Sequence, residues 1–173
     1  NSSYTGADGL ELLSTLHVNL AGGTWQNELT TAADLSEATL EQAYLDIKDW
    51  TTDRGNLINL SPVSLIIPSE LRFEAERILQ SPYRVSSADN DINALKSMGI
   101  FKKVVVNNYL TDTDAWFLQS PEEDHWMIFL EREPFNVVSN VDFRSRALQT
   151  AAWGRFDVDW VNNGIGIYGS PGA

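Results

Sequence analysis

Two short aspartate-containing segments are the part of this chain whose residue types and spacing come closest to chemistry. Asp89-Asn90-Asp91 and Asp112-Thr113-Asp114 place oxygen ligands at alternate positions, as calcium-binding loops do. Neither continues with the glycine and the distant glutamate of an EF-hand loop. Aspartates in turns also accept hydrogen bonds from neighbouring backbone N–H groups. We therefore expect turns at both places, with calcium binding as the alternative.

The other polar candidates lack the partners that catalysis needs. His17 and His125 are far apart in the sequence and sit in no triad or metal-ligand signature. Gly164-Ile165-Gly166 lacks the lysine and the following helix of a phosphate-binding loop. The three adjacent carboxylates at 122–124 are a weak candidate for a glycosidase pair. The sequence predicts no catalytic, cofactor-binding or metal-binding residue, and the protein is predicted not to be an enzyme.

Aromatic and basic side chains fit packing or subunit contact better than a substrate site. Arg144 and Arg146 share one face if residues 143–148 are extended, and there they could contact an acidic neighbouring subunit. A carbohydrate-binding face is the alternative use for the tryptophans, which are Trp25, Trp50, Trp116, Trp126, Trp153 and Trp160. Those at 116, 126 and 160 stand in predicted strands beside other apolar residues, so we expect core packing or subunit contact.

Length and charge narrow the class of protein. The chain has 173 residues, enough for one domain with a substantial core, and 43% of them are hydrophobic. The absence of cysteine excludes disulfides and thiolate chemistry. A net charge of −12 should repel nucleic acid, because affinity for DNA depends on basic contacts to phosphates. The chain begins without methionine and without a signal-peptide pattern, so we expect it to be a piece of a longer protein.

Hydrophobic periodicity predicts a mixture of helices and strands. A helix is predicted over 36–50, with Ser36 as N-cap and Leu35 and Leu40 as a hydrophobic staple. A second helix is predicted over 69–80 with Ser69 as its cap, and a polar loop over 83–99. Strands are predicted at 63–67, 103–106, 116–118, 126–130 and 156–160, the last half-buried because it alternates strictly. Without a regular βαβ order, the predicted class is α+β.

Five motifs occur in an order that resembles the C-terminal half of tailed-bacteriophage major capsid proteins, most closely the branch of the Mu-like major head subunit. The resemblance covers residues 8–173, and its motifs are LIIPSELRFEAERILQS, NDINALK, VVVNNYLTDTDAWFL, MIFLEREP and WGRFDVDWVNNGIGIYGS. No single motif is diagnostic, but their joint order and spacing are fairly specific.

This resemblance implies the Hong Kong ninety-seven capsid fold. The expected architecture is a mixed sheet with flanking helices, like the axial domain of a capsid subunit, plus strands that return to a peripheral domain. Residues 1–34 would form an extended segment on the body, 35–132 the axial body, and 133–173 the returning strands. Members of the family also carry an N-terminal arm, an extended loop and a spine helix, and none has a counterpart in this sequence.

The function implied by the resemblance is structural. The chain would be a fragment of a major head protein that self-associates into pentameric and hexameric capsomers of an icosahedral shell enclosing DNA, assembled in the bacterial cytoplasm. Its partners would be neighbouring subunits, with no specific nucleic-acid sequence, no membrane and no cofactor. The alternative is a calcium-dependent carbohydrate-binding module that uses the aspartate loops and exposed tryptophans.

Overall fold

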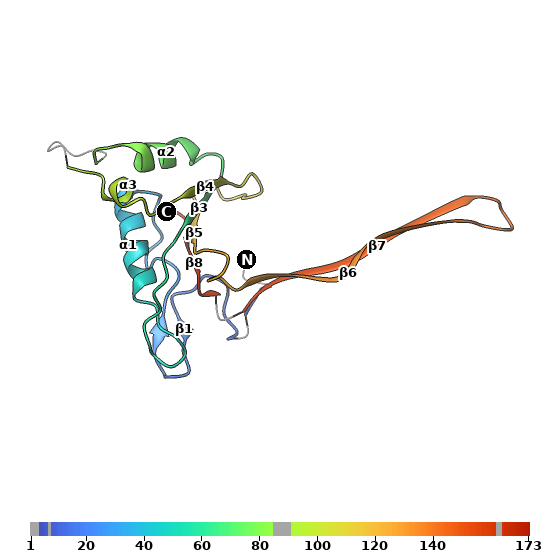
Figure 1. Ribbon diagram of the computed structural model, residues 1–173, viewed down its shortest axis with the longest axis horizontal. Coiled ribbons are helices and arrows are strands. Elements are labelled where there is room, and N and C mark those ends of the chain that lie inside the picture. The colour runs from blue at the N-terminus through green and yellow to red at the C-terminus, as the bar shows by residue number, and fades with distance from the viewer. Residues whose placement is uncertain (1–3, 7, 85–90, 162–163) are drawn as a thin grey trace.

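A small sheet forms the centre of the body, and a long two-stranded arm projects away from it (Figure 1). The computed structural model describes residues 4–6, 8–84, 91–161 and 164–173. The sheet order in this part of the chain is β4-β3-β5-β8, with bounds β3 Ser64–Ile67, β4 Lys103–Val106, β5 Trp116–Gln119 and β8 Ile167–Ser170. The architecture is therefore mixed α and β, consistent with a capsid domain.

Two short helices make the crossover that the one parallel strand pair of this sheet needs. β3 and β4 run parallel, so the chain between them must return across the sheet. It does so through α2 (Arg72–Gln80) and α3 (Ala94–Met98). The other two pairs, β3 with β5 and β5 with β8, are antiparallel.

Helix α1 (Glu37–Lys48) forms as the sequence predicts. The Ser36 hydroxyl accepts a hydrogen bond from the Thr39 backbone N–H, and the Thr39 hydroxyl accepts one from the Ser36 N–H. This reciprocal capping satisfies two backbone donors at the helix start. Leu40, Ala43 and Ile47 are buried on one face of the helix at helical spacing.

The second predicted helix has a different start, and a third was missed. α2 begins at Arg72 and its N-cap, Leu71, makes no side-chain hydrogen bond, so the prediction that Ser69 caps it is wrong. The Ser69 hydroxyl instead donates to Asn108 Oδ1 at 2.8 Å. α3 lies inside the predicted 83–99 loop. Its five residues are too few for a periodic signal, but its caps are recognisable: Asn93 accepts from the Lys96 N–H, and Gly99 ends it at φ 60°.

A chain of aromatic rings runs through the core and joins remote parts of the sequence. Trp25 meets Trp50 edge-on at 5.5 Å, and Tyr168 lies 6.5 Å from both Trp50 and Trp116. The indole N–H of Trp50 donates to the Gln26 carbonyl at 2.7 Å. Large aromatic surfaces contribute heavily to burial, so this chain holds the N-terminal segment, α1 and the sheet together.

The N-terminal segment lies on this core. It contains the short strands β1 (His17–Val18) and β2 (Thr24–Trp25), which pair with each other. The Asn27 side chain accepts from the Ser14 N–H at 2.8 Å and donates to the carbonyls of Leu12 at 2.6 Å and Gly164 at 3.5 Å. Through these bonds the two ends of the described chain are tied to one site.

The arm consists of β6 (Met127–Val141) and β7 (Leu148–Trp160). Its strands are much longer than the predicted 126–130 and 156–160. The register shifts between Glu131 and Asn136, around Pro134, whose nitrogen cannot donate to a ladder. The prediction that residues 156–160 are half-buried is wrong for residues 156–159, which are exposed because the arm has left the body. Trp160, at the base of the arm, is partly covered and contacts Tyr4.

The end of the arm also differs from expectation. Arg144 and Arg146 would share one strand face only if residues 143–148 were extended, but the chain turns between Asp142 and Ala147, whose backbones hydrogen-bond at 3.0 Å. The Asp142 carbonyl also accepts from the Arg146 N–H at 2.8 Å, and Arg146 has φ 55°. Arg144 and Arg146 therefore belong to the tip of a hairpin. None of the described helices is long and apolar enough to cross a membrane.

Candidate functional site

The arm has two chemically different faces. Residues paired across an antiparallel ladder point to the same side, and successive residues alternate sides. The register therefore assigns one apolar face to Met127, Phe129, Phe135, Val137, Val141, Leu148, Ala152, Phe156, Val158 and Trp160. Glu131, which pairs with Phe156, is the one charged residue that the register assigns to this face. This set is called the apolar face below.

The opposite face carries most of the arm's polar groups. It contains Glu133, Asn136, Asn140, Gln149, Arg155, Asp157 and Asp159, together with Ile128, Leu130, Val138, Ala151 and Trp153. The indole N–H of Trp153 donates to Glu133 Oε1 at 2.6 Å on this side. This set is called the polar face.

Side-chain contacts agree with the two assignments. On the apolar face the rings of Phe129 and Phe156 stack with centroids 5.7 Å apart. The hydroxyls of Ser139 and Thr150 lie 3.1 Å apart on the same face, nearer the tip. The two aromatic rings cover each other only in part, since Phe156 remains 71% exposed. The apolar face is thus formed but has no covering layer in the described chain.

Water contact along this face is energetically unfavourable. Burying apolar surface stabilises by about 25 cal/mol per Å², and a two-stranded hairpin alone in water is at best marginally stable. Phe135 is 73% exposed and Leu148 71% exposed. Large contiguous apolar patches with a polar rim mark interaction sites. The arm has the properties of a surface that binds another polypeptide.

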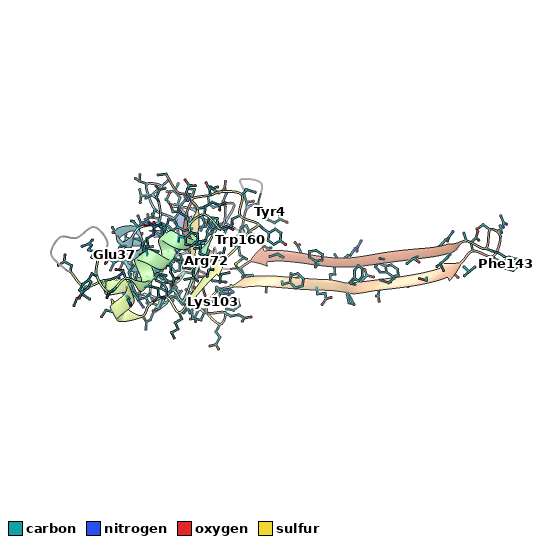
Figure 2. All side chains as sticks on the ribbon, turned by 90° about the horizontal axis from the view of Figure 1, so that it is seen from above. Tyr4, Glu37, Arg72, Lys103, Phe143 and Trp160 are labelled. Atoms are coloured by element: carbon teal, nitrogen blue, oxygen red, sulfur yellow. The ribbon has the colours of Figure 1, made fainter. Side chains whose placement is uncertain are left out.

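The base of the arm is held by aromatic packing. In Figure 2, Tyr4 and Trp160 lie side by side where the arm meets the body, and their ring centroids are 6.2 Å apart. A Cβ atom on Gly6 would stand 2.8 Å from the Trp160 indole nitrogen, so the glycine permits this close approach. The indole nitrogen is buried and has no hydrogen-bond partner among the described residues.

The tip of the arm is an ordered turn that presents a ring and two cations. Figure 2 shows Phe143 at the far end, and this side chain is 95% exposed. The Asp142 carboxylate accepts from the backbone N–H groups of Arg144 and Ser145 and from the Ser145 hydroxyl. The hydrogen bonds from Ser145, followed by that from Arg144, hold the pKa of Asp142 below its usual value.

A pocket of about 590 Å³ opens beside the base of the arm. Leu12, Leu13, Ala115 and Phe117 contribute apolar lining, and the carboxylates of Glu11, Glu28 and Asp112 are also part of its wall. Burial, and secondly the charge of Glu11, raises the pKa of Glu28. The described lining includes no basic residue, so this pocket is acidic and partly apolar.

The two histidines have ordinary packing roles in the described structure. His17 is fully buried, stacks on Trp25 at 4.7 Å, and its Nδ1 lies 2.7 Å from Asp8 Oδ2. His125 Nε2 lies 2.9 Å from Gln119 Nε2, at the start of the arm. The two residues belong to separate contacts. The described geometry brings no nucleophile to either ring.

The described residues of the two aspartate segments do not form a metal cluster. Asp89 and Asn90 lie outside the described residues. Asp112 and Asp114 hydrogen-bond each other, which is the largest cause that raises the pKa of Asp114. Within the described ranges, no group of three or more His, Asp or Glu side chains could hold a metal ion. The chain bends at Thr113 and Asp114.

The tryptophans do not form a common exposed face. Trp25, Trp50 and Trp116 are buried in the core, which confirms core packing for Trp116. Trp126 is 56% exposed and so does not pack in the core; subunit contact, the other expected use, stays a prediction for it. Trp153 lies on the polar face of the arm. These positions and the absent metal cluster in the described chain do not support a calcium-dependent carbohydrate-binding module.

The arm was the feature that sequence reasoning missed, although its signal was present. Strict alternation over residues 156–160 indicates a strand with one buried face. The prediction of a half-buried strand did not specify what covers its apolar side. The structure instead leaves the apolar positions exposed on a projecting ribbon, so the alternation is the signature of burial against something else.

The chain matches the sequence model of a family described as phage capsid protein, over residues 1–169. Comparison with curated proteins and with solved structures gave no match. Capsid proteins are structural components of the virion. A family match over nearly the whole length shows that this chain belongs to the phage capsid protein family.

Proposed function

We propose that this chain is a structural subunit that self-associates into the capsomers of an icosahedral phage shell enclosing DNA, and that the apolar face of its arm is a principal contact between subunits. The observation that carries this proposal is the exposure of that face along both strands of the arm. A shell protein needs broad surfaces that are buried only when copies meet. The apolar face has that property.

The charge distribution supports the arm as the associating part. The arm, residues 127–160, carries four arginines and five carboxylates, so 11 of the chain's 12 net negative charges lie outside it. Like charges repel when copies approach, and the repulsion is weakest where the charge is balanced. The arm therefore offers both the apolar surface and the smallest electrostatic cost for contact between identical acidic chains.

We further propose the Hong Kong ninety-seven capsid fold, in the branch of the Mu-like major head subunit. In this proposal residues 1–34 are an extended segment on the body, 35–132 an axial-domain body, and 133–173 strands that return towards a peripheral domain. The boundary at 132 falls within β6, and β8 pairs with β5 of the body. The arm and its tip would then be the peripheral part of the last range.

The proposed role uses no catalytic residue, cofactor or metal. Neighbouring subunits are the proposed partners, in rings of five and six, with assembly in the bacterial cytoplasm. The acidic composition supports a shell wall that does not retain DNA, because a net charge of −12 repels phosphates.

Sedimentation velocity of matched variants tests the proposal. Phe135→Ser with Phe156→Ser removes two rings from the apolar face, whereas Leu130→Ser with Val138→Ser makes a similar change on the polar face. Because buried aromatic anchors dominate interface energies, we expect the first pair to weaken self-association at least about tenfold and the second far less. Circular dichroism checks that both variants stay folded.

Two results would contradict the proposal. One is a wild-type chain that sediments as a monomer at about 100 μM, a concentration at which a contact with a dissociation constant of about 1 μM would be almost fully formed. The other is an equal loss of association in both pairs of variants, which would mean that the apolar face has no special part in it.

A further inference from the structure

We propose that the tip of the arm of one copy docks into the acidic pocket beside the arm base of a neighbouring copy, with Phe143 entering the pocket and Arg144 and Arg146 meeting its carboxylates. The tip is the turn 142–147, and the pocket is the one lined by Glu11, Glu28 and Asp112. This inference rests on the proposed self-association and names a second contact for it.

The tip has the chemistry of a docking element. Phe143 is 95% exposed, and the guanidinium groups of Arg144 and Arg146 make no ion pair with any described residue. The three hydrogen bonds to the Asp142 carboxylate fix the turn before any partner arrives. A preorganised loop loses less conformational entropy on binding than a flexible one.

The backbone at Arg146 gives independent support. Its φ of 55° lies in the left-handed region, where a glycine would fit without the steric cost that a side chain incurs. An arginine at such a position indicates that its side chain is used, because strained backbone is concentrated at functional sites. The strain also directs the chain into β7 and sets the two arginines on one short turn.

The pocket has the complementary chemistry. Its apolar lining at Leu13, Ala115 and Phe117 suits an aromatic ring, and its carboxylates suit guanidinium groups. Glu28 and Glu11 repel each other, and burial disfavours the charge on Glu28. A cation brought to this wall would offset the repulsion between Glu28 and Glu11. None of the described lining residues supplies one.

The tip that occupies the pocket must come from another copy of the chain, because a copy's own tip lies far from its own pocket. β7 has 13 residues, and at about 3.3 Å per residue it places the tip about 40 Å from the arm base. Figure 2 shows the arm extended, with Phe143 and Trp160 at opposite ends. Because the tip and the pocket are different surfaces, two copies can exchange tips reciprocally or each copy can dock head-to-tail on the next, and head-to-tail contacts generate rings or open arrays.

Disulfide trapping tests the contact directly, because the chain has no cysteine of its own. One copy carries Ala147→Cys at the tip, and a second, distinguishable by a tag, carries Thr111→Cys at the pocket. The matched control replaces the second with Leu57→Cys, at a site that is 72% exposed on the body. We expect mild oxidation to form the tip–pocket heterodimer at least about tenfold faster than the control pair, since a specific contact raises the local concentration.

Charge reversal then tests the chemistry of the contact. Arg144→Glu with Arg146→Glu in the tip copy should remove the preference for the pocket. Adding Glu11→Lys with Asp112→Lys in the pocket copy should restore it, because the ion pairs are re-formed with exchanged signs. Raised salt should weaken the wild-type preference, as for other exposed charge pairs.

The outcomes separate this inference from the proposed function. Arm-dependent association with equal cross-linking at pocket and control sites would overturn the tip–pocket contact and leave self-association intact. A tip variant that cross-links normally but loses affinity for a DNA duplex would also overturn it, in favour of a phosphate-binding tip. Loss of cross-linking together with a monomeric wild-type chain would reject both proposals.

Discussion

Phe135 and Gly154 face each other across the arm at the place where the strand register shifts. A Cβ atom at Gly154 would stand 3.3 Å from Phe135 Cα and 3.5 Å from Cδ2 of its ring. An aromatic ring on the neighbouring strand can occupy the space that a glycine leaves open in a sheet. The pair thus lets the apolar face continue through the irregularity near Pro134.

Gly154→Val is expected to disturb the apolar face without unfolding the body. The branched side chain would displace the Phe135 ring or its strand, because the space above Gly154 admits no more than a tight contact. We expect sedimentation to show weaker self-association and urea unfolding of the body to be unchanged. Ala151→Val, on the polar face, is the matched control. Equal behaviour of the two variants would contradict the importance of this contact.

Tyr168→Phe is expected to destabilise the body. The Tyr168 hydroxyl donates to Asp46 Oδ2 at 2.5 Å and so connects β8 to α1. Burial, followed by this hydrogen bond, raises the pKa of Tyr168 far above its usual value. Loss of a hydrogen bond to a charged group costs about 1.5–3 kcal/mol. Urea unfolding would measure it, with the 94% exposed Tyr109→Phe as the control expected to change little.

Asn27→Ala is expected to loosen the N-terminal segment. The buried side chain of Asn27 hydrogen-bonds the backbone N–H of Ser14 and the backbone carbonyls of Leu12 and Gly164. Its loss leaves these three backbone groups without this partner. An unsatisfied buried group costs about 1–3 kcal/mol, so we expect a loss of unfolding free energy in that range. Asn59→Ala, at an exposed site, should change it by less than about 0.5 kcal/mol. A shift no larger than that of the control would refute the role of Asn27.

Glu28→Gln is expected to stabilise the protein at neutral pH only. Burial raises the pKa of Glu28 in the folded state above its ordinary value of 4.5. The folded state therefore binds this proton more tightly than the unfolded state, so stability falls as the pH rises between the unfolded and folded pKa values. Above that window the glutamine variant should melt higher than wild type. Below about 4.5 the difference should disappear.

The measurement for this prediction is the melting temperature as a function of pH. Glu70→Gln provides a control at an exposed position of the body. A stabilisation by Glu28→Gln that is the same at acidic and neutral pH would contradict the proposed cause. At acidic pH the Glu28 carboxyl group is protonated and neutral, so replacing it with a neutral amide removes no buried charge.

Local signals predicted the elements whose cause lies within a few residues. Ser36 caps α1 because its hydroxyl reaches a backbone N–H three residues away, and residues 64–67 form β3 because a short β-branched run lies between two prolines. The same reasoning failed at Ser69, which was predicted to cap α2. Its hydroxyl instead donates a hydrogen bond to Asn108, a residue distant in the sequence. No local pattern contains that competition.

The length of the arm was beyond local reasoning for a related reason. Within β7, only the alternating part near Trp160 carries a clear strand signal. Within β6, Pro134 interrupts the pattern after the strand predicted at 126–130. Pairing with the partner strand makes both continuous. The two strands stabilise each other by cross-strand contacts such as that of Phe129 with Phe156, which lie 27 positions apart in the sequence.

The sequence by itself determined the acidic character of this protein, the capped helix α1 and the strands β3, β4 and β5 of the sheet, because composition, capping and periodicity act locally. The order of its motifs also carried the resemblance to capsid subunits. The buried strand β8 was not predicted. Tertiary structure alone decided where the alternating face points. The hydrophobic effect requires apolar side chains to leave water but does not specify what covers them. Only the departure of β6 and β7 from the body shows that the chain's own core does not.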